Sequence, residues 1–292
     1  FPRVSVEKAS TKVGDQSIMM IMPDSDSPDF ATRDPDMPDD ALGLGLDLPP
    51  ATKPVVAAAA QPTAATGGAA YRVLARKYRP QTFAELIGQD AMVQTLGNAI
   101  KRDRLAHAFL MTGVRGVGKT STARLIAKAL NCIGAEGQGG PTIDPCGSCE
   151  PCVAIAEGRH IDVIEMDAAS HTGVDDVREI IEAVRYSAVS ARYKIYIIDE
   201  VHMLSKNAFN ALLKTLEEPP PHVKFIFATT EIRKVPVTVL SRCQRFDLKR
   251  IEPEVQMALL RKIADAEGAQ ITDGALALIT RAAEGSARDA TS

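Results

Sequence analysis

Residues 113–120 have the composition and spacing of a phosphate-binding loop. They fit the pattern G-x-x-x-x-G-K-[ST] and lie between an apolar run and a helical pattern. Glycines let backbone N–H groups curl around phosphate oxygens, and the N-terminus of the following helix adds its partial positive charge. Lys119 can reach the β- and γ-phosphates of a nucleotide, and the Thr120 hydroxyl can ligate Mg²⁺. The alternative is a chance glycine-rich loop, which the strand–loop–helix context disfavours. The candidate nucleotide-binding residues are Gly113, Val114, Arg115, Gly116, Val117, Gly118, Lys119 and Thr120.

Two adjacent carboxylates, Asp199 and Glu200, follow an apolar run at residues 194–199. In a nucleoside-triphosphatase site, Asp199 would hold hydrated Mg²⁺ and Glu200 would polarise the attacking water. By itself, an acidic pair at a strand end is more often a solvated turn. Downstream of a phosphate loop, the pair indicates the second half of a nucleotide-hydrolysing site, because ligands of parallel sheets bind at the carboxyl ends of the strands.

Thr230 and Arg242 are further candidates for contact with nucleotide. Thr230 ends the next predicted strand, where its hydroxyl is placed either to sense the γ-phosphate and orient water or to cap the following turn. Arg242 follows a strand–helix unit. It is either a surface charge or a planar cation that completes the site of a neighbouring subunit. The sequence alone leaves both pairs of alternatives open.

Four cysteines within 21 residues suggest a metal site. Soft sulfur ligands suit tetrahedral Zn²⁺, and a site with four protein ligands leaves no position for water, so the metal would be structural. Free reduced thiols are the alternative. Cys243 is expected to be a core thiol, and His107 and His202 are expected to serve packing or hydrogen bonding rather than metal binding. The candidate zinc ligands are Cys132, Cys146, Cys149 and Cys152.

Alternating apolar runs and helical patterns predict the elements that position these residues. Strand followed by helix, repeated, favours an α/β fold with a parallel sheet and right-handed crossovers. Three runs are nearly continuously apolar, at residues 162–167, 194–199 and 224–230, and are expected to be covered on both faces. Further strands are predicted at 107–112 and 243–248, and helices at 120–130, 174–186, 206–217, 253–267 and 272–284.

Composition divides the chain of 292 residues into unlike parts. Residues 1–70 hold nine of the 18 prolines and ten acidic against five basic residues, so a disordered acidic extension is expected there, with an acidic partner-binding arm as the alternative. Residues 71–292 carry a net charge of +2 and enough apolar residues for a core. We expect an ATPase core at 71–250, with the zinc module at 132–152, and the start of a helical lid domain at 251–292.

Several classes of protein are disfavoured. No apolar run approaches the roughly 18 residues of a membrane span, so no membrane association is expected. No secretory signal is recognisable, and a reducing cytoplasm is the default location. Lys101, Arg102 and Arg104 form a basic cluster that could contact DNA phosphates, although a solvated helix end is the favoured interpretation. The first and last residues suggest a fragment of a longer protein.

The assembled motifs resemble the bacterial DNA polymerase III gamma/tau subunits, the AAA+ motors of the sliding-clamp loader. The resemblance runs from about residue 71 to 292. It is carried by VLARKYRPQTF at 73–83, the loop at 113–120, the cysteine segment, IDEVHML at 198–204, NALLKTLEEPP at 210–220, ATT at 228–230, SRC at 241–243 and EGSARD at 284–289.

The resemblance implies a function and a set of site roles. The chain would bind ATP and Mg²⁺, hydrolyse ATP within a DNA-directed DNA polymerase holoenzyme, and carry Zn²⁺ on the four cysteines. Residues 76–83 would form part of the adenine-side wall. Thr230 would be the first sensor, Arg242 a finger acting on the adjacent subunit's ATP, and Arg288 the second sensor, reaching from the lid.

The family also implies partners: other loader subunits, the sliding clamp and primed DNA, in a nucleoid-associated cytoplasmic complex. Polymerase core and helicase would bind C-terminal regions that this chain lacks, as it lacks the collar domain.

Three alternative functions remain to be weighed. A helicase motor is disfavoured by the cysteine insert and by the absence of an aromatic-rich DNA loop. A non-hydrolysing switch is disfavoured because Lys119, Thr120, Asp199 and Glu200 are all present. A zinc-dependent DNA-binding module is the least favoured alternative, since no base-reading helix is expected after the cysteines.

Overall fold

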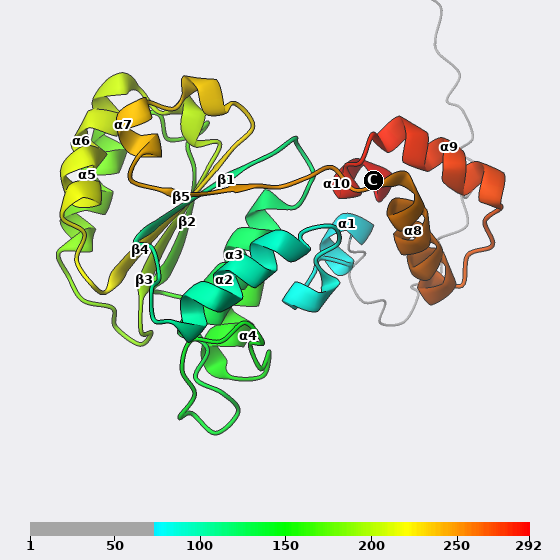
Figure 1. Cartoon of the computed structure of the whole chain (residues 1–292), viewed down its shortest axis with the longest axis horizontal. Coiled ribbons are helices and arrows are strands. Elements are labelled where there is room, and N and C mark those ends of the chain that lie inside the picture. Colours follow the sequence, from blue (N-terminus) through cyan, green and yellow to red (C-terminus); the bar gives the residue numbers. More distant parts are fainter. Residues whose placement is uncertain (1–72) are drawn as a thin grey trace, which may run out of the picture. The chain divides into compact units, whose positions relative to one another are not determined.

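The computed structural model describes residues 73–292, and its centre is a sheet of five parallel strands (Figure 1). The strand order is β2-β3-β4-β1-β5, so that β4 separates β1 from β3. The strands are β1 (Ala108–Thr112), β2 (Val163–Asp167), β3 (Lys194–Asp199), β4 (Val223–Thr229) and β5 (Gln244–Asp247). The predicted α/β architecture with a parallel sheet is confirmed, and each strand boundary lies within one residue of its predicted position.

The burial of the strands corrects one sequence-based expectation. Strands β1 and β4 are buried along their whole length, and β3 is buried except at its two ends. Strand β2, also expected to be covered on both faces, is half-buried because it lies at the edge of the sheet. Its sequence carries Glu165 and Asp167, which an edge strand can direct toward solvent. The expectation was therefore wrong for 162–167.

Helices cover both faces of the sheet and divide its core into two layers. On one face, α2 (Asp90–Lys101), α3 (Lys119–Asn131) and α4 (Glu150–Glu157) pack against Phe109 and Met111 of β1. On the other, α5 (Val174–Val184), α6 (Lys206–Glu217) and α7 (Val237–Leu240) pack against Ala108 and Leu110 (Figure 1). Successive side chains of a strand point to opposite faces, so a single apolar strand supplies both layers.

Several short elements lie between the longer helices and strands or before them, and the sequence analysis did not predict them. They are the helix α1 (Leu74–Lys77) and three 3₁₀ turns, η1 (Phe83–Glu85), η2 (Val201–Met203) and η3 (Ile232–Lys234). Helices α2 and α4 were also not predicted. A glycine at position 97 and a proline at position 151 obscure their helical patterns, although Pro151 is tolerated in the first turn of α4.

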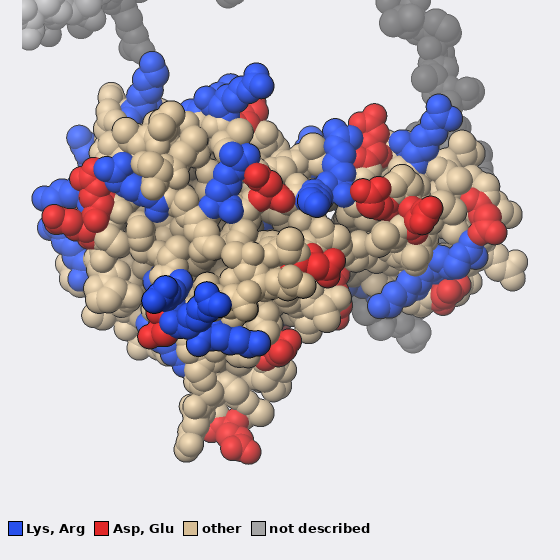
Figure 2. Space-filling view, viewed as in Figure 1, with Lys and Arg blue, Asp and Glu red and all other residues tan. Residues whose placement is uncertain are grey.

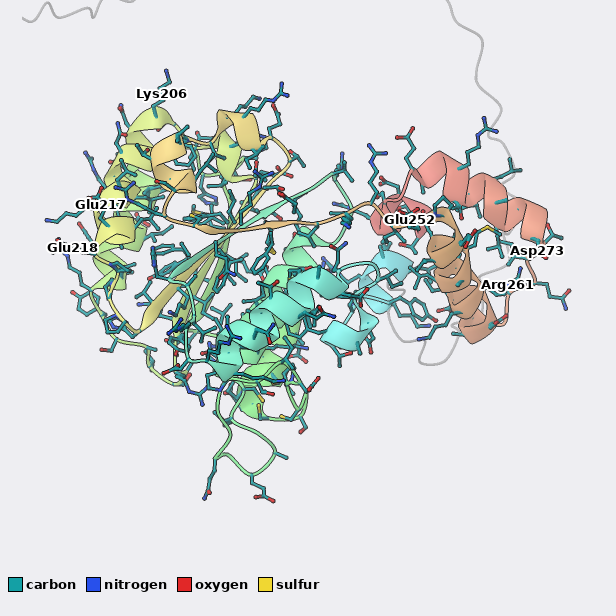
Figure 3. The ribbon with its side chains drawn as sticks, viewed as in Figure 1. Lys206, Glu217, Glu218, Glu252, Arg261 and Asp273 are labelled. Carbon is teal, nitrogen blue, oxygen red and sulfur yellow. The ribbon has the colours of Figure 1, made fainter. Side chains whose placement is uncertain are left out.

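The last three helices form a core of their own. They are α8 (Pro253–Glu267), α9 (Asp273–Ala283) and α10 (Ala287–Ala290), and they bury Leu260, Leu276, Ala283 and Ala290 together. Arg261 and Asp273 form an ion pair between α8 and α9 (Figure 3). The predicted signals act as expected: Gly268 ends α8 in the left-handed conformation, and the Thr272 hydroxyl accepts a hydrogen bond from the N–H of Ala275.

The expected disordered extension at 1–70 lies outside the described residues. Within residues 73–292, no helix is both long enough and apolar enough to cross a membrane.

Candidate active site and metal centre

The phosphate-binding loop connects the end of β1 to the start of α3. Gly113, Gly116 and Gly118 have φ values of 152°, 76° and 101°, a run that side-chain-bearing residues rarely adopt. The Nζ atom of Lys119 lies 3.1 Å from the carbonyl oxygens of Gly113 and Val114, inside the curve of the loop. Burial lowers the pKa of Lys119, and the carboxylates of Glu200 and Asp199 partly oppose that shift. The loop thus encloses an amine beside two carboxylates.

The carboxylate pair lies next to this loop. The Thr120 hydroxyl donates a hydrogen bond of 2.6 Å to Oδ2 of Asp199. These residues are 79 positions apart in the chain: Thr120 lies in the first turn of α3, which follows β1, and Asp199 ends β3, which β4 separates from β1. Glu200 follows with φ = 46°, an uncommon conformation for a residue other than glycine, and its N–H donates to Oδ1 of Asp199 at 2.9 Å. A hydroxyl and a carboxylate at this separation suit Mg²⁺, which prefers hard oxygen ligands.

The end of β4 adds two threonines with different environments. The Thr230 hydroxyl is exposed and donates a hydrogen bond of 3.1 Å to Oε2 of Glu200. Thr229 is fully buried, and its hydroxyl accepts from the N–H of Glu231 at 3.0 Å. The turn-capping role that the sequence left open for Thr230 therefore belongs to Thr229. Thr230 instead contacts the carboxylate expected to polarise water.

Arg242 lies two residues after the end of α7. Its Nη2 atom is 2.5 Å from Oε1 of Glu217 at the end of α6, and its Nη1 atom donates to the carbonyl of Thr238 at 2.6 Å. The neighbouring Glu218 is next in the chain (Figure 3). Both partners of the ion pair are partly exposed.

Helix α10 brings Arg288 to the phosphate loop. The N–H of Arg288 donates to the carbonyl of Gly116 at 3.3 Å. A Cβ atom on Gly116 would lie 2.0 Å from Oγ of Ser286 and 3.1 Å from Cβ of Arg288. A side chain at position 116 would therefore overlap Ser286 next to α10, in addition to straining the backbone. The sequence motif indicated the phosphate role of Gly116 and gave no signal for its contact with Ser286.

The segment at 76–83 lies along α3 and supplies positive charge. Burial and the nearby guanidiniums of Arg124, Arg76 and Arg288 lower the pKa of Arg79. Residues 79–81 line a small pocket together with side chains of α3 and with Ala156 of α4. The buried Nζ of Lys128 donates to Oε1 of Gln81 at 2.8 Å. The carboxylate of Glu165, which forms an ion pair with Arg124, partly opposes the lowering of the Arg79 pKa.

The four cysteines converge on one point. Their sulfur atoms all lie within 4.8 Å of one another, and none forms a disulfide. Backbone N–H groups point at the sulfurs: Cys146 N–H donates to Sγ of Cys132, and Cys149 N–H donates to Sγ of Cys146, both at 3.4 Å. This second contact lowers the pKa of Cys146 to about 6. The donor set fits a thiophilic metal ion.

Cys243, His107 and His202, whose side chains could also ligate a metal, lie apart from this cluster. Cys243 packs against the core layer of α5 and α6, and burial raises its pKa to about 12. Burial lowers the pKa of His107, whose Nε2 atom has no hydrogen-bond partner among the described residues. His202 contacts oxygens near the carboxylate pair and does not join the cysteines.

Charged side chains of both signs cover the face of the described residues that Figure 2 shows. On the face shown in Figure 2, Lys and Arg side chains are interspersed with Asp and Glu over the described residues. Lys101, Arg102 and Arg104 are exposed at the end of α2, as expected for a solvated helix end, and their contact with DNA stays a prediction.

A parallel sheet with a phosphate loop and a carboxylate pair at strand ends, followed by the helices α8, α9 and α10, is typical of the AAA+ class of P-loop ATPases. The same fold occurs in the RuvB Holliday junction branch migration motor of Thermotoga maritima, with a TM-score of 0.52 and 20% identity over 73% of this chain and 63% of that one. At this level of identity, the likeness concerns the fold alone.

Sequence comparison gives the family. Residues 88–252 match the family model described as "DNA polymerase III, delta subunit", and the chain belongs to this family. It is 53% identical over 222 residues to the DNA polymerase III subunit tau/gamma of Haemophilus influenzae, covering 76% of this chain and 32% of that protein. It is 50% identical to the DNA polymerase III subunit tau of Bacillus subtilis, covering 76% of this chain and 38% of that protein. The chain thus spans about a third of the length of these relatives.

Proposed function

We propose that the chain is the ATP-hydrolysing motor portion of a bacterial sliding-clamp loader, which places a ring clamp on primed DNA during replication. The observation that carries the proposal is the 2.6 Å hydrogen bond between Thr120 and Asp199, which joins the phosphate loop to the carboxylate pair. The 53% identity to a DNA polymerase III tau/gamma subunit favours a clamp-loader motor over other AAA+ motors.

The proposed roles follow from the chemistry of each group. The backbone N–H groups of the loop and the Lys119 ammonium bind the phosphates of ATP. Thr120 and Asp199 hold Mg²⁺, which when bound neutralises charge on the phosphates. Glu200 polarises the attacking water. The contact of Thr230 with the Glu200 carboxylate supports a sensor role, in which the state of the γ-phosphate alters this hydrogen bond.

Two arginines extend the site beyond the core. We propose that Arg242 acts on the ATP of the adjacent subunit, where its guanidinium stabilises transition-state charge. We propose that Arg288 reaches the γ-phosphate from the lid, and its backbone contact with Gly116 supports that role. ATP then draws neighbouring subunits together, and by reciprocity assembly must raise the affinity for ATP. Hydrolysis weakens the grip on DNA and releases the clamp.

The cysteine cluster is proposed to hold a structural Zn²⁺ on Cys132, Cys146, Cys149 and Cys152. Four sulfurs within 4.8 Å of one another and the N–H groups pointing at them support zinc over free thiols. Zinc would fix the start of α4 relative to the end of α3, because Cys149 and Cys132 are the capping residues at those two ends.

The domain division and the partners are proposed on the same basis. The ATPase core comprises 71–250 and the lid 251–292, which the separate apolar core of α8, α9 and α10 supports. The partners are other loader subunits, the clamp and primed DNA, in the cytoplasm at the nucleoid. Polymerase core and helicase would bind the parts of the full-length protein that this chain does not span.

The test is ATP hydrolysis by the complete loader built with the full-length protein. Primed DNA together with the ring clamp should stimulate hydrolysis, and a Glu200→Gln variant should bind ATP but hydrolyse it slowly. Hydrolysis that is indifferent to DNA and clamp would contradict the loader. Processive, DNA-dependent unwinding would favour a helicase motor instead.

A further inference from the structure

His202 lies in the turn η2, two residues after Glu200, and its side chain is only 6% exposed. The ring atom Nδ1 lies 3.3 Å from Oε2 of Glu200 and 3.1 Å from Oγ1 of Thr229. The ring atom Nε2 lies 3.5 Å from Oε1 of Glu231. One buried imidazole therefore links the carboxylate pair to the end of β4.

The groups that hold His202 are themselves fixed to the sheet. Thr229 is the last residue of β4, is fully buried, and accepts the N–H of Glu231 at its hydroxyl. Glu231 is restrained in turn by an ion pair of 2.9 Å with Lys234. The orientation of the imidazole is therefore set mainly by the central strand β4, through Thr229.

The carboxylate of Glu200 needs such an anchor. Its side chain is 31% exposed and has three rotatable bonds, so a free carboxylate would sample several orientations. Thr230 and His202 both contact the oxygen Oε2, which leaves Oε1 available for another partner. Thr230 is exposed, whereas His202 is buried, so His202 is the more constrained of the two contacts.

We propose that His202 is the positioning residue of Glu200: the Nδ1 side of its ring, anchored by Thr229, holds Oε2 and directs Oε1 to the attacking water. The inference rests on the proposed function, in which Glu200 polarises that water. Displacing a catalytic group by about 1 Å can lower a rate about 100-fold. The contact should therefore affect the turnover number kcat, while leaving ATP binding, which uses other residues, unchanged.

Three substitutions of His202 separate its contacts. In His202→Asn, the amide nitrogen occupies roughly the place of Nδ1 and can still contact Glu200 and Thr229. In His202→Gln, the amide nitrogen occupies roughly the place of Nε2 and reaches only Glu231. His202→Phe keeps the ring packing and removes both nitrogens. Each variant is made in the full-length protein and assembled with its partner subunits.

We expect kcat of His202→Gln and His202→Phe to fall about 10- to 100-fold with an unchanged KM for ATP, and His202→Asn to retain kcat within about threefold. His222→Phe is the matched control, because His222 lies just before the opposite end of β4 and bonds the carbonyl of Val184. Its kcat should stay at the wild-type value.

Two results would overturn the inference: wild-type kcat in His202→Phe, or equal losses in His202→Asn and His202→Gln. If the His202 variants do not fold, as judged by thermal unfolding, Thr229→Val removes the anchor of Nδ1 and should give the same loss of kcat. A Glu200→Gln variant run alongside separates the two hypotheses. Normal turnover in that variant would refute the role of Glu200 itself, whereas slow turnover there with a normal His202→Phe would refute only the positioning role.

Discussion

The hydroxyl of Thr120 and the carboxylate of Asp199 are joined by a hydrogen bond of 2.6 Å, although β4 separates β3 from β1, the strand that leads to the phosphate loop. Thr120 opens the helix after the phosphate loop, and Asp199 ends β3. Their meeting point is the carboxyl edge of the sheet, where parallel strands present their loops. The pair offers a hydroxyl and a carboxylate oxygen to one divalent cation.

Substitution of Asp199 by Asn should weaken the use of Mg²⁺. The amide keeps the size of the side chain and removes the negative charge, so hydrolysis at limiting Mg²⁺ should fall by about 100-fold or more, since even indirect partners of a metal ligand contribute about 10- to 100-fold. ATPase rates measured across a Mg²⁺ titration check this. The matched control, Asp265→Asn on the exposed surface of α8, should titrate as wild type. An unchanged titration for Asp199→Asn would remove this residue from the metal site.

Gly116→Ala should destabilise the chain because the new Cβ would overlap Ser286. The left-handed conformation alone costs an L-residue about 1–2 kcal/mol, and the 2.0 Å approach to Oγ of Ser286 adds to that. Gly268→Ala provides the comparison, since Gly268 has φ = 67° and open space around its Cβ position. Chemical denaturation should show a larger loss for Gly116→Ala.

The double variant Gly116→Ala with Ser286→Gly tests the cause of that loss. The double variant should regain the stability that Gly116→Ala loses through overlap with Ser286. Replacing a capping serine by glycine itself costs only a few tenths of a kcal/mol. A double variant no more stable than Gly116→Ala would show that the lid contact does not contribute.

The Arg242–Glu217 ion pair should contribute little to stability. Both side chains are partly exposed, and such pairs are worth about 0–1 kcal/mol. Arg242→Ala should therefore melt close to wild type and bind ATP normally, yet lose hydrolysis in the assembled loader. Glu217→Ala should also leave stability nearly unchanged, as should its neighbour Glu218→Ala. Normal hydrolysis by the assembled Arg242→Ala loader would refute action on the adjacent subunit.

Removing a sulfur ligand should release the metal. Purified, reduced protein is expected to contain zinc in a ratio of about one ion to one chain, since structural zinc sites use four ligands. Cys152→Ser should lose the zinc and melt at a lower temperature. Cys243→Ser, which alters a thiol outside the cluster, should retain it. Metal analysis that finds no zinc in the wild-type protein would contradict the assignment.

Asp162 should make stability depend on pH in the acid range. Burial opposes its ionisation, but the N–H groups of Val189, Ser190 and Ala191, each 2.8 Å from a carboxylate oxygen, hold its pKa below the usual 3.8. A carboxyl with a depressed folded-state pKa stabilises the fold above the unfolded pKa, and this stability disappears as pH falls through the folded value.

An Asp162→Asn variant tests whether the ionised carboxylate of Asp162 stabilises the fold. It should be less stable than wild type at pH 7 by about 2 kcal/mol or more, because hydrogen bonds to a charged group are lost. The difference should shrink as the pH falls below about 4. Denaturation measured at several pH values provides the test, and a difference independent of pH would contradict it.

The sequence by itself determined the phosphate loop, the five strands, the five helices α3, α5, α6, α8 and α9, and the parallel sheet. These features depend on local patterns: the spacing of glycines and Lys119, the length of apolar runs, and stop signals such as Gly268. The candidate metal site was also predicted from the sequence, because four cysteines lie within one short segment, and the fold brings their sulfurs within 4.8 Å of one another.

Only the tertiary structure decided which distant residues meet. The order of strands in the sheet placed β2 at an edge, which no property of its apolar run specified. The tertiary structure likewise decided that Arg242 pairs with Glu217 and that Ser286 lies against Gly116. Such contacts depend on how whole elements pack, and packing joins residues whose separation along the chain carries no local periodic signal.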